Sequence, residues 1–179
     1  MNNLEMAMTT TDNSAIIASQ ILESGVLDDS KPKSGSEVIE TRFGKVKISY
    51  DNPIVFGKGI LGMPDKSNFC VVDFPVEKFS QFKLLQSLDD NELSFIALPI
   101  DIENQFIDRQ DIEDSCSDLG ISLSNLAVLL IVSVHREVNN VRLSANSRAP
   151  IFIDSANHTA EQYVLRNNKY VVRHAISTN

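Results

Sequence analysis

The chain lacks the usual sequence signals of metal binding and catalysis. Its only cysteines, Cys70 and Cys116, are far apart and match no zinc-ligand spacing. They provide no disulfide framework either, so reduced thiols are expected, as in the cytoplasm. The sequence contains no H-E-x-x-H, C-x-x-C or G-x-S-x-G motif, and its three histidines are dispersed. We therefore predict no metal, no other cofactor and no enzymatic activity.

Long apolar runs and basic residues are also scarce. The longest apolar run, residues 126–134, is shorter than the roughly 18 residues of a membrane span and predicts a buried strand instead. No basic residue precedes Lys31, so the N-terminus lacks the positive start of a signal peptide. A net charge of −8 disfavours nucleic-acid binding, which depends on lysine and arginine. We expect a cytoplasmic protein that contacts neither membrane nor nucleic acid. Its acidity either keeps it soluble or suits a basic protein partner.

The composition divides the chain in two. Residues 1–38 are polar and acidic and contain no aromatic residue, which predicts a flexible extension. Apolar residues at helical spacing within it allow one short helix over residues 14–24. Residues 39–179 are long enough for one domain with its own core.

This second part carries an all-β pattern. Many short apolar runs separated by turns indicate an antiparallel barrel or sandwich. An acidic stretch closed by Gly120 predicts a short helix over residues 111–120. Strands are predicted over residues 45–50, 68–73, 125–134, 141–145, 149–154, 161–165 and 170–174, with a hairpin over residues 81–100.

The hairpin is the most informative of these segments. Its second strand is apolar at most positions of both faces, whereas a half-exposed strand alternates apolar with polar residues. We therefore expect it to be covered on both sides. Between the two strands, Asp89 and Asp90 fit a tight turn better than a catalytic carboxylate pair, because Asp side chains bond the local backbone in turns.

One motif has the letters of a dinucleotide-binding fingerprint. Residues 57–62 read G-x-G-x-x-G, but the fingerprint requires a helix directly after the glycines. Here residues 63–68 lead into another strand and leave no room for that helix. We interpret the motif as a glycine-rich turn.

The segment after the hairpin has the sharpest functional signal. Residues 101–118 carry seven acidic side chains against Arg109 alone, and apolar residues stand among them. Charge steers association and apolar anchors supply affinity, so the segment is either a partner-binding surface or a solvated loop over a helix. The candidate partner-binding residues are Ile100, Asp101, Ile102, Glu103, Phe106, Ile107 and Asp108.

Several motifs together resemble the flagellar assembly factor FliW family. Residues 56–62 are similar to its F-P-x-G-L-P-G turn, residues 84–87 with 93–95 to its L-Q-S and L-x-F hairpin, and residues 145–151 to its A-N-L-L-A-P-I segment. The order and spacing of these motifs, over roughly residues 40–176, carry the resemblance. Residues with an expected structural role are Phe56, Gly59, Gly62, Gln86, Ser87, Phe95, Asn146 and Pro150.

The resemblance implies a small antiparallel β-barrel, closed or partly open, with one or two short helices. It implies a protein without enzymatic activity that binds flagellin in the cytoplasm. When free, such a protein binds the RNA-binding repressor CsrA and relieves its repression of flagellin synthesis. Asn146 is expected to bond backbone groups at the turn before Pro150.

Two alternatives remain open from the sequence. The segment after Pro99 lacks the aromatic-rich run usual in the family, which leaves a flagellin chaperone without CsrA antagonism as one alternative. The other is a barrel that binds a small ligand or catalyses a reaction in an interior pocket. A barrel filled with large apolar side chains would argue against it.

Overall fold

The structure is a computed structural model that describes residues 33–138 and 140–176. The predicted helix over residues 14–24, and most of the predicted extension, lie outside this part of the chain. The described residues form two 3-10 turns, η1 (Glu77–Phe79) and η2 (Leu123–Asn125), the α-helix α2 (Arg109–Leu119), and the strands β1 (Ser36–Thr41), β2 (Gly44–Ser49), β3 (Ile54–Phe56), β4 (Asn68–Asp73), β5 (Lys83–Ser87), β6 (Ser94–Ile100), β7 (Leu126–Glu137), β8 (Asn140–Ala145), β9 (Ile151–Asp154), β10 (Thr159–Gln162) and β11 (His174–Ile176).

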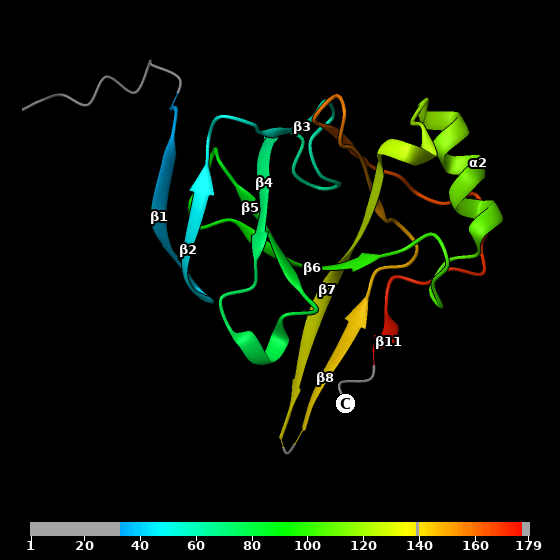
Figure 1. Cartoon of the computed structure of the whole chain (residues 1–179). Helices are drawn as coiled ribbons and strands as arrows, with labels where there is room; N and C mark the ends of the chain where they lie inside the picture. The colour runs from blue at the N-terminus through cyan, green and yellow to red at the C-terminus, as the bar shows by residue number, and fades with distance from the viewer. Residues whose placement is uncertain (1–32, 139, 177–179) are drawn as a thin grey trace, which may run out of the picture. The chain divides into compact units, whose positions relative to one another are not determined.

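The strands form a closed barrel, which confirms the predicted fold class (Figure 1). The order β7-β6-β5-β4-β3-β10-β9 returns to β7 through a β7–β9 pairing. All pairs in this ring are antiparallel except β3–β10, which is parallel. Strand β8 and, beyond it, β11 continue the sheet outside the ring, and β1 and β2 form a separate hairpin.

Strand β7 belongs both to the barrel and to a ribbon that projects from it. Its first half pairs with β9, from Leu126↔Asp154 to Leu129↔Ile151. Its second half pairs with β8, from Val132↔Ala145 to Glu137↔Asn140. The five residues 146–150 separate β8 from β9 on the same edge of β7, and there the chain leaves the ribbon and enters the barrel.

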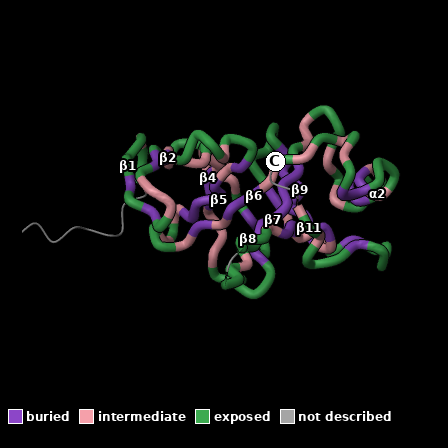
Figure 2. The backbone as a smooth tube through the Cα atoms, turned by 90° about the horizontal axis from the view of Figure 1, so that it is seen from below, coloured by how far each residue is buried: buried purple, intermediate pink, exposed green. Residues whose placement is uncertain are grey.

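Apolar residues cover both faces of the barrel wall. The interior holds a cluster that includes Phe56, Phe69 and Leu85. Outside the wall, one cluster lies under the β1–β2 hairpin and includes Leu84 and Ile96. Another lies under α2 and the C-terminal segment. Buried residues accordingly run along the central strands in Figure 2.

This layering explains the doubly apolar hairpin. Neighbouring residues on a strand point to opposite faces. Leu85 therefore enters the barrel while Leu84 packs under β1 and β2, and both are fully buried. The interior is filled by large apolar side chains, which argues against a small-ligand pocket inside the barrel.

The hairpin turn is organised by the Gln-Ser pair that follows the leucines. The hydroxyl of Ser87 accepts hydrogen bonds from the backbone N–H groups of Asp89 (3.2 Å) and Asp90 (3.1 Å). The buried amide of Gln86 lies within hydrogen-bond distance of the carbonyl oxygens of Ser87 and Leu93. The carboxylate of Asp89 accepts three hydrogen bonds from the Ser67–Asn68 segment and thereby ties the turn to β4. This geometry is that of a structural turn.

Two of the predicted strands near the C-terminus are wrong in extent or place. The strand predicted over residues 161–165 ends at Gln162, and residues 170–173 are not a strand, because β11 begins only at His174. Residues 163–173 instead pass beside α2. Tyr170 is buried there while Val171 and Val172 are 50% and 60% exposed, so the apolar run does not reflect pairing in a sheet.

The predicted helix is confirmed as α2. Its last residue is Leu119, and Gly120 caps it with a φ of 68°, in the left-handed region that favours glycine. Its buried residues are Ile112, Ser115 and Cys116, which places one side of the helix on the barrel and leaves the other exposed.

The glycine motif forms the turn between β3 and β4, and no helix follows it before β4. Gly59 has φ +67°, and a Cβ atom there would lie 2.5 Å from the carbonyl oxygen of Met63. We expect Gly59→Ala to lower the free energy of unfolding by about 1–3 kcal/mol through backbone strain. Gly57→Ala is the matched control, because a Cβ at Gly57 meets nothing within 4 Å. Chemical denaturation of both variants measures the difference, and equal midpoints would contradict this assignment.

Candidate functional site

The connector from β6 to α2, residues 101–108, is a defined structure held by Asn104. The side-chain amide of Asn104 donates to the carbonyl oxygen of Asp101 at 2.8 Å. Its side-chain oxygen accepts from the backbone N–H groups of Phe106 (2.7 Å) and Ile107 (2.8 Å). The connector therefore presents its side chains in a fixed arrangement.

The candidate partner-binding residues fall into two groups. Phe106 and Ile107 are 9% and 1% exposed and belong to the cluster under α2. The ring of Phe106 packs edge-on against His174 with centroids 5.0 Å apart. These two side chains anchor the connector to the barrel and are not available at the surface. Ile100 and Ile102 are half-buried, whereas the exposed members are Asp101, Glu103 and Asp108.

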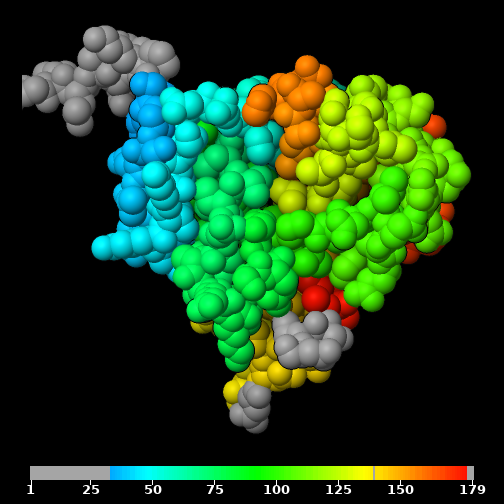
Figure 3. All heavy atoms as spheres, in the orientation of Figure 1, coloured from blue at the N-terminus to red at the C-terminus, as the bar shows by residue number. Residues whose placement is uncertain are grey.

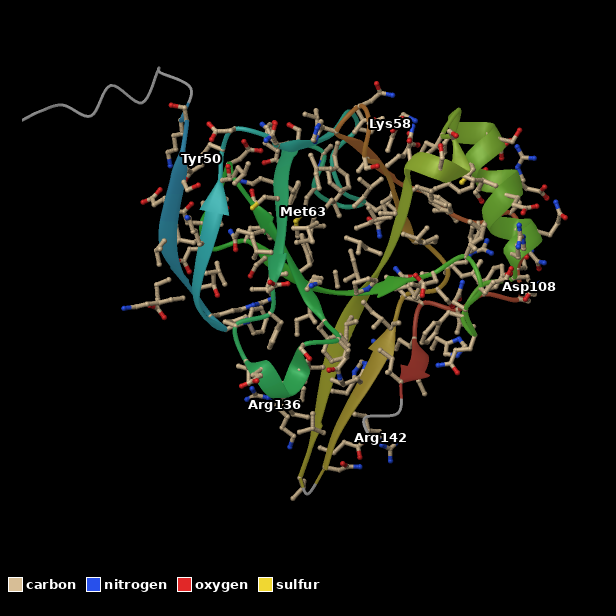
Figure 4. All side chains as sticks on the ribbon, viewed as in Figure 1. Tyr50, Lys58, Met63, Asp108, Arg136 and Arg142 are labelled. Atoms are coloured by element: carbon tan, nitrogen blue, oxygen red, sulfur yellow. The ribbon has the colours of Figure 1, made fainter. Side chains whose placement is uncertain are left out.

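The carboxylates of the connector and of α2 form what we call the acidic surface, and Figure 4 labels Asp108 on it. Arg109 pairs with Glu103 (2.5 Å) and Glu113 (2.7 Å). The other cations at this surface come from residues 163–170. The acidic surface consists of Asp101, Glu103, Asp108, Asp111, Glu113, Asp114 and Asp118.

Residues 163–170 supply contacts to this surface that the sequence did not reveal. Lys169 pairs with Asp108 (2.6 Å) and Asp111 (3.1 Å), and Arg166 pairs with Asp118 (2.7 Å). The sequence gives no local signal for these contacts, because about 50 to 60 positions separate the partners.

The cations do not neutralise the acidic surface. Among the described residues, the cations that pair with these seven carboxylates are Arg109, Arg166 and Lys169. Within residues 33–138 and 140–176, neither Asp101 nor Asp114 makes an ion pair at contact distance; Asp114 accepts a hydrogen bond from Gln110 (2.9 Å) and attracts Arg166 electrostatically. The surface therefore keeps a negative charge that is open to a partner.

Asp111 links the acidic surface to stability. A hydrogen bond from the hydroxyl of Tyr170, followed by the interaction with Lys169, lowers the pKa of the Asp111 carboxyl. The folded pKa lies below the unfolded value of about 3.9, so the carboxylate stabilises the fold above that value. This contribution is lost as the pH falls through the folded pKa.

We therefore expect Asp111→Asn to unfold at lower urea concentration than the natural protein at neutral pH. The difference should shrink as the pH falls below about 4, because protonation removes the same interaction from the natural protein. Urea unfolding midpoints measured across this pH range test the expectation. A midpoint difference that stays constant with pH would contradict it.

The predicted structural residues lie away from the acidic surface. Phe56 is fully buried and Phe95 is half-buried, and both belong to the barrel interior. Asn146 begins the segment between β8 and β9, where its side-chain oxygen accepts from the N–H groups of Arg148 (3.1 Å) and Ala149 (3.0 Å). Pro150, at the end of this segment, is buried. Asn146 thus stabilises the segment 146–150, through which the chain passes from the ribbon into the barrel.

The described residues contain no group of three or more His, Cys, Asp or Glu side chains placed to hold a metal ion. Among the same residues, no helix has the length and hydropathy needed to span a membrane. Burial raises the pKa of both the Cys70 and Cys116 thiols.

The closed barrel, its covered outer wall and the acidic surface together define a small β-barrel protein with one charged face. A family model described as FliW protein matches residues 37–176. The chain belongs to the FliW family.

Individual relatives agree with this membership. The chain is similar to the "Flagellar assembly factor FliW" of Syntrophus aciditrophicus, with 31% identity over 80% of this chain and 89% of the relative. It is 28% identical to the protein of the same name from Thermoanaerobacter pseudethanolicus, over 75% of this chain and 88% of the relative. A crystal structure of the flagellar assembly factor FliW matches with a TM-score of 0.59 and 22% identity, and the match covers 79% of this chain and 98% of that one.

Proposed function

We propose that this protein is a cytoplasmic flagellar assembly factor that binds flagellin and, when free, binds a CsrA-type repressor. Binding the repressor relieves its repression of flagellin synthesis, so that synthesis follows export. The observation that carries the proposal is the acidic surface, on a chain of the FliW family, with carboxylates that its own cations leave unpaired.

The charge of this surface suits an RNA-binding partner. A protein that binds RNA presents lysine and arginine to phosphates, so an acidic face attracts it and steers the encounter. The same negative charge, once bound, repels RNA phosphates. Antagonism then requires no contact between this protein and RNA, and the proposal includes no nucleic-acid, membrane, cofactor or catalytic role.

The proposed contact surface keeps only the accessible part of the candidate set. Asp101, Glu103 and Asp108 supply charge, and the half-buried Ile100 and Ile102 supply apolar contact at its edge. Phe106 and Ile107 support the connector from below.

The burial of those two side chains also favours the second candidate, a flagellin chaperone without repressor antagonism. With Phe106 and Ile107 inside, the connector offers little apolar area to the repressor. The two functions share flagellin binding and differ in the effect on the repressor.

Isothermal titration of the full-length protein with flagellin and separately with the repressor tests both. Binding to each partner at micromolar or lower concentration is the expected result. Binding to flagellin alone would select the chaperone function. Binding to neither partner would refute the proposed function.

A further inference from the structure

A second surface of opposite character lies at the base of the β7–β8 ribbon. It is a groove of about 540 Å³ between two walls. The aromatic wall comes from Phe43, Phe74 and Phe79, and the aliphatic wall comes from Val134, Val141 and Leu143. In Figure 3 the segment around η1, in green, adjoins the β7–β8 ribbon, in yellow, at the lower end of the molecule. We call this feature the apolar groove.

The aliphatic wall is one face of an amphipathic ribbon. Residues paired directly across two strands place their side chains on the same face. The pairs Val134↔Leu143 and Arg136↔Val141 therefore share the groove face. The alternate pairs, such as Ser133↔Ser144 and His135↔Arg142, form the opposite, polar face. Past Val132, β6 no longer covers the edge of β7, so the ribbon extends beyond the barrel with an apolar face.

The groove face is exposed although it is apolar. Val134 is 43% exposed, Val141 is 57% exposed, and Val76 on the opposite side is 43% exposed. A contiguous exposed apolar surface in a groove marks an interaction site rather than chance exposure of single residues. The aromatic wall is built for contact, since Phe74 packs against both Phe43 (5.4 Å) and Phe79 (6.2 Å).

The charges at the groove are positive, although the chain as a whole is acidic. Lys78 lines the groove, and Arg136 extends the groove face of β7. Within the described residues, neither makes an ion pair with a carboxylate. The guanidinium of Arg42 lies 4.7 Å from the ring centroid of Phe43 at the aromatic wall. A basic partner would be repelled here, whereas acidic side chains beside an apolar stripe would be attracted.

We infer that the apolar groove binds an amphipathic α-helix whose apolar stripe is flanked by acidic residues. A groove with side-chain walls on both sides suits the helix-in-groove mode, in which residues at helical spacing insert as anchors. The inference rests on the proposed function and assigns each of the protein's two proposed partners to a different surface. The acidic surface takes the basic repressor, and the apolar groove takes a helix of the other partner, flagellin. The body of the docked flagellin then keeps the repressor off the acidic surface, so that only the free protein binds the repressor.

Two probes test this inference by fluorescence anisotropy. One is a labelled synthetic helix of about 18 residues, roughly five turns, with leucine on one face and glutamate on both flanks. Its analogue carries lysine in place of each glutamate. The second probe is labelled flagellin. The full-length protein should bind the glutamate helix and flagellin, and should bind the lysine analogue at least about tenfold more weakly.

Matched variants locate the site. Val134→Glu and Val141→Glu should each weaken both interactions by about tenfold or more, because a charge enters the apolar wall. Val138→Glu, at the fully exposed tip of the ribbon, should change them less than about twofold. Arg136→Glu should weaken binding of the glutamate helix, and Arg142→Glu, on the polar face of the same ribbon, should not. Figure 4 labels both arginines, on opposite sides of the ribbon.

The outcomes separate this inference from the proposed function. Flagellin binding that is equal in the natural protein, Val134→Glu and Val141→Glu overturns the inference alone. The inference is also overturned if the natural protein binds neither flagellin nor the glutamate helix. If the natural protein forms a dimer that Val141→Glu dissociates, a second copy of this chain occupies the groove. That result would also overturn the inference. Repressor binding should be unchanged in every groove variant. If the natural protein itself does not bind the repressor, that result counts against the proposed function and not against this inference.

Discussion

Asp101→Lys combined with Asp114→Lys is expected to weaken binding to the CsrA-type repressor by at least about tenfold. These two carboxylates belong to the acidic surface and, among the described residues, make no ion pair at contact distance, although Asp114 also attracts Arg166 electrostatically. Reversing both changes the surface by four charges and turns attraction into repulsion. The loss should be largest at low ionic strength, because salt screens exposed charges.

The matched control moves the same charge elsewhere. Asp65 and Glu92 are exposed residues of the turns before β4 and β6, and neither belongs to the acidic surface. Asp65→Lys combined with Glu92→Lys changes the net charge equally and should leave repressor affinity within about threefold. Surface plasmon resonance at two salt concentrations measures both variants. Equal losses in the two variants would show that net charge matters and the acidic surface does not.

Phe69→Ala is expected to lower the free energy of unfolding by about 3–5 kcal/mol, a large share of the stability of an ordinary domain. Phe69 is fully buried in the barrel interior. Its ring packs edge-on against Phe56 with centroids 5.1 Å apart and also contacts Phe95 at 6.4 Å. Truncation removes these contacts and leaves a cavity that the closed ring of strands restricts from collapsing.

Urea denaturation followed by circular dichroism measures this effect. Val172→Ala, at a valine that is 60% exposed, is the control and should stay within about 0.5 kcal/mol of the natural protein. A loss below about 1 kcal/mol for Phe69→Ala would mean that the interior is loosely packed and would reopen the possibility of a pocket inside the barrel.

The barrel was predictable because its signals are local. The run from Ser94 to Leu98 is apolar on both faces, and the structure places one face inside the ring and the other under a second layer. The helix from Arg109 to Leu119 is capped by Gly120, because glycine readily adopts the positive φ that the cap requires. In both cases a few neighbouring residues carry the information.

The errors and omissions come from contacts between distant residues. Residues 170–173 have the composition of a strand, but Tyr170 is held against α2 by Asp108 and Asp111, about 60 positions away. The same contact region buries Phe106 and Ile107, which looked like surface anchors in the sequence. The apolar groove was also missed, because its walls come from separate segments near Phe74 and Val134.

We propose that this protein frees RNA from a CsrA-type repressor and that flagellin prevents it from doing so. The most direct test of this claim is a gel-shift assay on a preformed complex of the repressor with a labelled RNA leader that the repressor binds. Addition of the full-length protein should release the RNA, and prior addition of flagellin in excess should abolish the release. RNA that remains fully bound at saturating, micromolar concentrations of the protein would contradict the claim.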